Sequence, residues 1–108
     1  MASGQTTIAS RKFLAIDKDG REFELTIAVG EPYQISETEW ACLASMEGLH
    51  GRFADMHGVD SWQALQLAHQ IVAQMLVAFT ERGGRLFWPE ERAPVTPEEL
   101  FPQLVRRS

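Results

Sequence analysis

One stretch near the middle of the chain, residues 59–84, restricts the possible folds more than any other. Its apolar residues recur at spacings of three and four, which is the period of one helix face. Asp60 is placed to cap the first turn, and Gln63 follows three positions later, as in a capping box. Gly83-Gly84 supplies the left-handed residue that often ends a helix. The pattern predicts one helix over residues 61–82, about 30 Å long.

The two faces of this predicted helix differ in chemistry. The residues expected to face the core are Leu65, Ala68, Ile71, Val72, Met75, Ala78 and Phe79. The opposite face is rich in glutamine, and residues 61–80 contain no Asp, Glu, Lys or Arg. A solvated helix face normally carries charges, although glutamine is also a good helix former. The face therefore has two interpretations, helix propensity alone or a surface that a partner partly covers.

The segments around the helix read as strands. Asp17-Lys18-Asp19-Gly20 is a hairpin turn signal, and the strand after it alternates apolar with polar residues. A later segment is apolar on both faces, which is typical of a central strand. The predicted strands cover residues 12–17, 21–29, 40–47, 52–57 and 85–88.

These elements predict an α+β fold with a mostly antiparallel sheet of about five strands. Four strands form a meander before the helix, which packs on one face of the sheet. The strand at 85–88 has two open positions, antiparallel beside the first strand or parallel beside the fourth. Thr96-Pro97-Glu98-Glu99 predicts a short C-terminal helical turn.

We expect three regions along the chain. Residues 1–10 are small and polar and read as a disordered tail, while residues 11–90 form the single α+β domain. Residues 91–108 are a C-terminal extension that contains four apolar residues, and these need a surface to pack on. They are Leu100, Phe101, Leu104 and Val105.

Charge and composition exclude several classes of protein. The chain has 108 residues and a net charge of −5, which fits one domain and argues against nucleic acid as the main partner. No apolar run is long enough to span a membrane, and the first residues lack the pattern of a signal peptide. We therefore expect a cytoplasmic protein with no membrane contact. Cys42 is the single cysteine, so no intrachain disulfide is possible.

Few residues suggest chemistry. His50, Asp55 and His57 form an alternative site for a metal ion or an acid–base pair, although their spacing matches no established metal motif. The other interpretation of these residues is a polar edge strand. Cys42 has no catalytic signature around it and is predicted to be buried and inert, and His69 to be a boundary histidine.

We assign no catalytic, cofactor-binding or metal-ligating residue and expect no cofactor. The three tryptophans are expected to pack in the core or at its rim. They are Trp40, Trp62 and Trp88.

Three short motifs resemble a family of small bacterial proteins of unknown function. They are Trp40-Ala41-Cys42, the helix start Gly58-Val59-Asp60-Ser61-Trp62-Gln63-Ala64-Leu65-Gln66-Leu67, and Leu86-Phe87-Trp88-Pro89. The resemblance covers roughly residues 11–90. It implies a bacterial, cytoplasmic, single-domain protein and brings no activity, cofactor or site residue.

The sequence as a whole favours a non-catalytic protein-interaction module over an enzyme. We expect it to self-associate as a homodimer or to bind another protein, because two uncharged surfaces lack an obvious cover. The candidate contact residues are Gln66, Gln70 and Gln74 on the helix and Leu43 on the sheet face away from Trp40. The alternative function is a small enzyme, or a binder of a small ligand or metal, that uses His50, Asp55 and His57.

Overall fold

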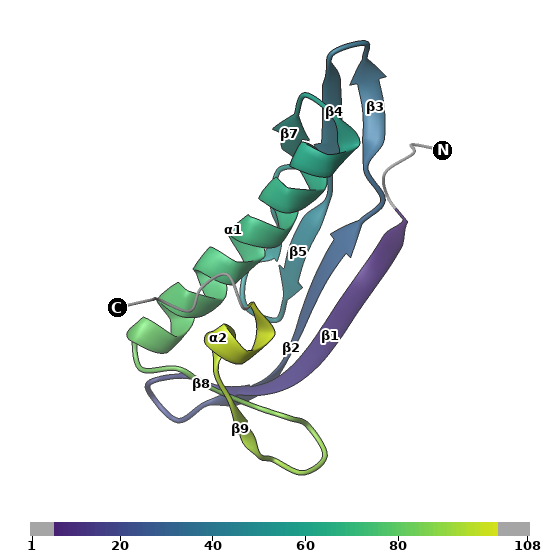
Figure 1. Ribbon diagram of the computed structural model, residues 1–108. Helices are drawn as coiled ribbons and strands as arrows, with labels where there is room; N and C mark the ends of the chain where they lie inside the picture. The colour runs from purple at the N-terminus through teal and green to yellow at the C-terminus, as the bar shows by residue number, and fades with distance from the viewer. Residues whose placement is uncertain (1–5, 102–108) are drawn as a thin grey trace.

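The computed structural model describes residues 6–101, which form an α+β fold with two antiparallel sheets and one long helix (Figure 1). The strands are β1 (Thr7–Ile16), β2 (Glu22–Gly30), β3 (Tyr33–Ser36), β4 (Glu39–Cys42), β5 (Ala44–Glu47), β6 (Gly51–Arg52), β7 (Met56–Gly58), β8 (Arg85–Phe87) and β9 (Pro94–Val95). The helices are α1 (Ser61–Glu81) and α2 (Pro97–Leu100). The predicted fold class is confirmed, whereas the prediction of five strands was too low.

The larger sheet has the strand order β6-β5-β2-β1-β8-β9, with every neighbouring pair antiparallel. The predicted hairpin of β1 and β2 is confirmed. β8 lies beside β1, where Leu14 is opposite Phe87, and this is the antiparallel position of the two that the sequence left open. β1 starts at Thr7 rather than at residue 12, so residues 7–10 are strand and not tail. Residues 1–5 of the expected tail lie outside the described residues.

The smaller sheet has the order β3-β4-β7 and was not predicted. The single strand predicted at 40–47 was wrong, because the chain changes sheets at Leu43, with β4 in the smaller sheet and β5 in the larger one. The strand predicted at 52–57 divides in the same way into β6 and β7. β3 pairs with β4 as a hairpin, and β3 lies between two predicted strands in a segment where no strand was predicted.

Both ends of α1 confirm the signals in the sequence. The backbone N–H of Gln63 donates to Asp60 Oδ1 at 2.8 Å, so Asp60 is the N-cap. The Gln63 side chain reaches one residue beyond the usual capping box and accepts from the backbone N–H of Val59 at 2.8 Å. At the other end Gly83 has a φ of +100°, and the N–H groups of Gly83 and Gly84 donate to Thr80 and Phe79. These bonds form a Schellman motif.

The buried face of α1 differs in part from the predicted one. Its buried residues are Ala64, Ala68, Val72, Ala73, Leu76 and Phe79. Leu65, Ile71 and Met75 flank this face and are only partly buried. Small residues face the strands because the helix approaches β7 closely. A Cβ on Gly58 would lie 2.6 Å from the backbone nitrogen of Ala64.

The core lies between α1 and the sheets, and α1 runs from β4 and β7 at its N-terminal end towards β8 at its C-terminal end (Figure 1). α2 lies beside α1 and confirms the predicted C-terminal helical turn, which begins with a capping box of Thr96 and Glu99. Phe101 after it is 2% exposed and belongs to the core. The segment up to Phe101 is therefore part of the main body, while Leu104 and Val105 lie outside the described residues.

Candidate functional site

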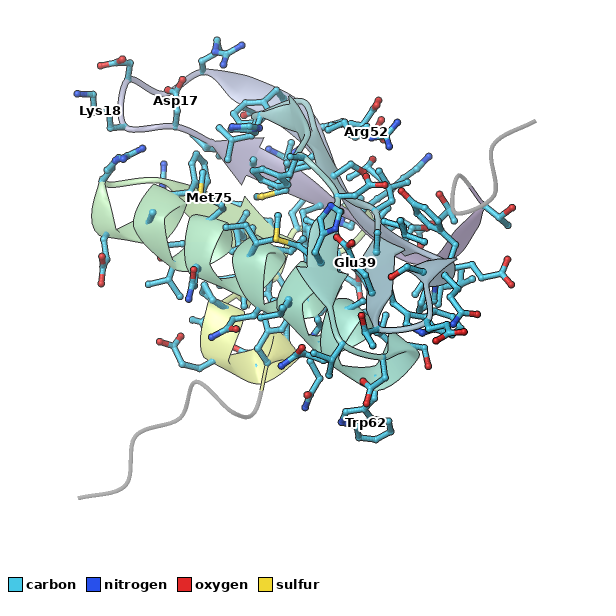
Figure 2. The ribbon with its side chains drawn as sticks, turned by 90° about the horizontal axis from the view of Figure 1, so that it is seen from above. Asp17, Lys18, Glu39, Arg52, Trp62 and Met75 are labelled. Carbon is cyan, nitrogen blue, oxygen red and sulfur yellow. The ribbon has the colours of Figure 1, made fainter. Side chains whose placement is uncertain are left out.

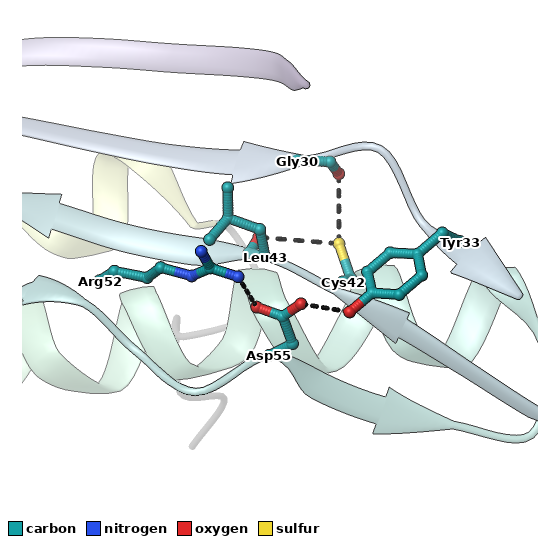
Figure 3. A network of polar contacts seen from close by, with 6 residues as sticks. All are labelled: Gly30, Tyr33, Cys42, Leu43, Arg52 and Asp55. Carbon is teal, nitrogen blue, oxygen red and sulfur yellow. Dashed lines mark hydrogen bonds and ion pairs between the residues drawn. The ribbon is translucent and has the colours of Figure 1, made fainter. Parts of the chain in front are cut away.

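Asp55 is the centre of a polar network that joins three segments of the chain (Figure 3). The Tyr33 hydroxyl of β3 donates to Asp55 Oδ2 at 2.5 Å, and Arg52 Nη2 of β6 donates to Asp55 Oδ1 at 2.8 Å. The Asp55 side chain is 10% exposed and the Arg52 side chain 48% exposed, so the carboxylate is much better shielded than its cation. The network ties the smaller sheet to the end of the larger one.

Opposing effects set the pKa of Asp55. Burial raises it, but the hydrogen bonds from Tyr33 and Arg52 and the nearby positive charge more than offset burial, so the pKa is lowered overall. The same hydrogen bond to Asp55 raises the pKa of the Tyr33 hydroxyl. At neutral pH the Asp55 carboxylate is therefore ionised and accepts a hydrogen bond from the protonated Tyr33 hydroxyl. This contact stabilises the fold.

We expect Asp55→Asn to lower the free energy of unfolding by about 1–2 kcal/mol at neutral pH, because hydrogen bonds to a charged group are lost. The loss is limited to this range because Arg52 is partly solvated. A carboxyl group with a lowered pKa in the folded state stabilises the protein above its unfolded pKa of about 3.9. That stabilisation disappears as the pH falls through the folded pKa. The difference between wild type and variant should therefore shrink near pH 3, as measured by urea unfolding.

Glu39→Gln is the control for this prediction, because Glu39 and His57 are both exposed and their pair contributes little. A difference that stays constant with pH would contradict this role of the Asp55 charge.

The other two residues of the alternative site face separate neighbours. The His50 ring stacks on Phe53 with a centroid distance of 4.2 Å. His57 Nδ1 lies 2.6 Å from Glu39 Oε2, and both of these side chains are exposed. Within residues 6–101, no three His, Cys, Asp or Glu side chains lie close enough together to hold a metal ion. His50, Asp55 and His57 thus have three different sets of contacts.

Cys42 is at the end of β4 and is 0% exposed. Its thiol donates to the backbone carbonyl of Gly30 at 3.2 Å (Figure 3). Burial raises the pKa of the thiol, which keeps it protonated and unreactive. The predicted buried state of Cys42 is confirmed.

A cavity of about 210 Å³ opens between the larger sheet, α1 and α2. Its lining residues are Ala9, Ser10, Arg11, Ile27, Ala28, Val29, His69, Val72, Leu100 and Phe101. His69 lies at its wall, with its ring 4.7 Å from the Phe101 ring in an edge-on contact. The volume is below the roughly 300–1,000 Å³ of small-molecule sites, so it suits an inserted side chain better than a cofactor.

The side of α1 that faces away from the sheets forms a continuous surface, which we call the α1 surface. It consists of Val59, Trp62, Gln66, Gln70 and Gln74, all of them exposed. Val59 is 64% exposed and Trp62 is 73% exposed. Figure 2 shows Trp62 pointing away from the body of the protein at the start of the helix. Its five residues carry no charge, and the two apolar ones lie at the start of the helix.

Two predictions about surface residues were wrong. Leu43 is only 8% exposed, since it lies where the chain passes from one sheet to the other, and it offers little contact area. Trp62 packs neither in the core nor at its rim, because it lies on the outer side of the first helical turn. Trp40 and Trp88 do pack against the core as predicted.

Two residues of these sites, Tyr33 and Trp62, were not among the candidates predicted from the sequence. Tyr33 binds Asp55 across 22 positions of sequence, and no local pattern marks that contact. The exposure of Trp62 had a local signal, because Trp62 lies outside the helical stripe of buried residues that includes Ala64 and Ala68.

Comparisons with known proteins give a family and nothing more specific. A family model described as a domain of unknown function (DUF6968) matches residues 9–96. No curated protein and no solved structure matches the chain significantly. Among the described residues, neither helix has the length and apolar character needed to cross a membrane.

Proposed function

The chain belongs to the DUF6968 family, and we propose that it is a non-catalytic protein-interaction module that self-associates as a homodimer and offers the α1 surface to another protein. The groups with reactive side chains support a non-catalytic role, because structural contacts already engage them. Tyr33 and Arg52 hold Asp55, and Cys42 is buried with its thiol bonded to a backbone carbonyl.

The exposure of Trp62 is the observation that carries this proposal. An indole that is 73% exposed, beside a Val59 that is 64% exposed, leaves a large apolar area in water. Tryptophan is among the residues that contribute most binding energy at protein interfaces, and exposed apolar patches often mark interaction sites. The glutamines that follow on α1 present no charge that a partner would have to desolvate, so covering this surface costs less than covering a charged helix face, provided that the partner hydrogen-bonds the amides.

Site-specific photo-crosslinking tests the α1 surface. A benzoyl-phenylalanine placed at Gln70 in the native host should give one discrete product that is heavier than the chain and its dimer. The matched control position is Glu24, which is exposed on the opposite side of β2 from the buried Leu25. The Gln70 product should disappear when Trp62→Ala is added, although this substitution should change stability by no more than about 0.5 kcal/mol.

Three results would contradict the proposal. They are no product at Gln70, the same products at Gln70 and Glu24, and a Gln70 product that persists with Trp62→Ala. No product at Gln70 would mean that no partner protein binds the α1 surface. The same products at both positions would indicate non-specific contact, and a product that persists with Trp62→Ala would mean that Trp62 does not contribute to binding.

A further inference from the structure

β1 has an open edge over most of its length. It is a ten-residue strand, yet β8 pairs only with its last three residues, from Leu14 to Ile16. β8 is followed by Trp88 and Pro89, and proline cannot donate to a strand ladder. Among residues 6–101, no strand lies beside Thr7–Phe13 on that side (Figure 1). A row of unpaired backbone groups of this kind is a template for another strand.

The alternation of the backbone shows which residues face the open edge. Asp17 donates its N–H to Arg21 across the hairpin, so Asp17 points towards β2. Successive residues of a strand direct their N–H and C=O groups to opposite sides, so Ser10, Lys12, Leu14 and Ile16 point away from β2. The register between β1 and β2 shifts between Thr7 and Ala9, so this alternation applies from Ala9 onwards. Within residues 6–101, the backbone donors and acceptors of Ser10 and Lys12 on the open side therefore have no strand partner. Both side chains are also exposed, as are all six residues from Thr7 to Lys12.

We infer that a second copy of this chain occupies the edge, with the two β1 strands antiparallel and Ser10 opposite Ser10 on the two-fold axis. This inference rests on the self-association in the proposed function and names the contact between the copies. It leaves the α1 surface free for another protein. The larger sheets of the two copies would become one continuous sheet.

Backbone regularity and charge favour this register. Pairing about Ser10 keeps the regular residues Ala9–Arg11 at the centre of the contact, away from the irregularity between Thr7 and Ala9 and from Trp88, whose ring lies 5.5 Å from the Phe13 ring. Arg11 then lies opposite Ala9, and Lys12 lies opposite Ile8. A centre at Arg11 or at Lys12 would instead place two like charges directly opposite each other, which is unfavourable.

The residues that would lie opposite Arg11 and Lys12 support a second copy of the chain as the occupant of the β1 edge. Ile8 is 52% exposed in one copy, and the aliphatic stem of Lys12 from the other copy would cover it. The open stretch contains two cations and no anion, while Ala9 and Ile8 present no charge to them. The strand is thus complementary to itself in this register.

Disulfide trapping tests both the surface and the register. In a Cys42→Ala parent, which has no other thiol, Ser10→Cys places one cysteine on the proposed two-fold axis. Cα atoms of a hydrogen-bonded antiparallel pair are about 5.5 Å apart, within the roughly 4.4–6.8 Å that a disulfide spans. Oxidised glutathione should therefore convert this variant to a covalent dimer that a reductant reverses.

Lys12→Cys in the same parent is the matched control. In the inferred register the two copies of residue 12 are offset by four positions, or roughly 13 Å along the strands, so no disulfide should form. The molar mass of the parent by light scattering at micromolar concentration should be about 24 kDa, twice the 12.2 kDa of one chain.

The outcomes separate this inference from the proposed function. A parent of two chains whose Ser10→Cys variant does not crosslink would place the dimer contact elsewhere and overturn the inference, while self-association would stand. Equal crosslinking of Ser10→Cys and Lys12→Cys would indicate random collision and would also overturn it. A parent with the mass of one chain would overturn the inference together with self-association, but not the α1 surface.

Discussion

Phe13→Ala should lower the free energy of unfolding by about 3–5 kcal/mol, the range for removing a buried aromatic side chain. Phe13 is 0% exposed and belongs to the core on the inner side of β1. Its ring lies 5.5 Å from the Trp88 ring, so the truncation removes an aromatic contact as well as buried area. A domain of this size has a total stability of about 5–15 kcal/mol, so the variant should lose a large part of it.

Chemical denaturation of Phe13→Ala beside Phe87→Ala measures this effect. Phe87 is the matched control because it lies on the same sheet, next to Leu14, but is only half-buried. Its truncation should cost clearly less. Equal losses at the two positions, or a loss below about 1 kcal/mol for Phe13→Ala, would show that β1 does not form the centre of the core.

Local signals in the sequence predicted the elements that depend on neighbouring residues. Asp60 caps the first turn of the helix and Gly83 follows its C-cap, Arg82, so both signals act within one turn. The hairpin of β1 and β2 follows from the turn at 17–20 and the alternation after it. In each of these elements a local signal, a helix cap or a tight turn, sets the pairing of all the residues that follow, so the residue pattern alone specifies them.

The division of two predicted strands has no local signal. Leu43 is an apolar residue between apolar residues, without the glycine or proline that usually interrupts a strand. The chain changes sheets there because β5 pairs with β2 while β4 pairs with β3 and β7. The pairings with β2 and β7 are contacts with segments distant in sequence. Patterns that describe one strand at a time do not contain that information.

The same division explains why the contacts of Asp55 do not follow from the predicted strand. A continuous strand over 52–57 would place Asp55 and His57 on one face, two positions apart. In the structure β7 starts only at Met56, so Asp55 lies before the strand and turns towards Tyr33 and Arg52. The open edge of β1 is also a non-local property, since it depends on where β8 pairs and on how soon Pro89 ends that pairing.

Gly48→Ala should be among the most damaging small substitutions in the chain, with an expected loss of about 2–5 kcal/mol from two separate costs. Gly48 has a φ of +104°, a conformation that strains any residue with a Cβ. A Cβ there would also lie 2.2 Å from the backbone carbonyl oxygen of Glu24. That oxygen cannot move freely, because Glu24 is held in β2 opposite Leu14 of β1.

Gly51→Ala separates the two costs, because Gly51 ends the same turn with a φ of +90° but has open space where the Cβ would be. This variant carries the conformational strain without the collision, so urea unfolding should show a loss of about 1–2 kcal/mol. The excess loss in Gly48→Ala then measures how tightly the turn after β5 packs on β2. Equal losses in the two variants would mean that the turn moves away from Glu24 at little cost, and the close packing of β5 on the hairpin would not contribute to stability.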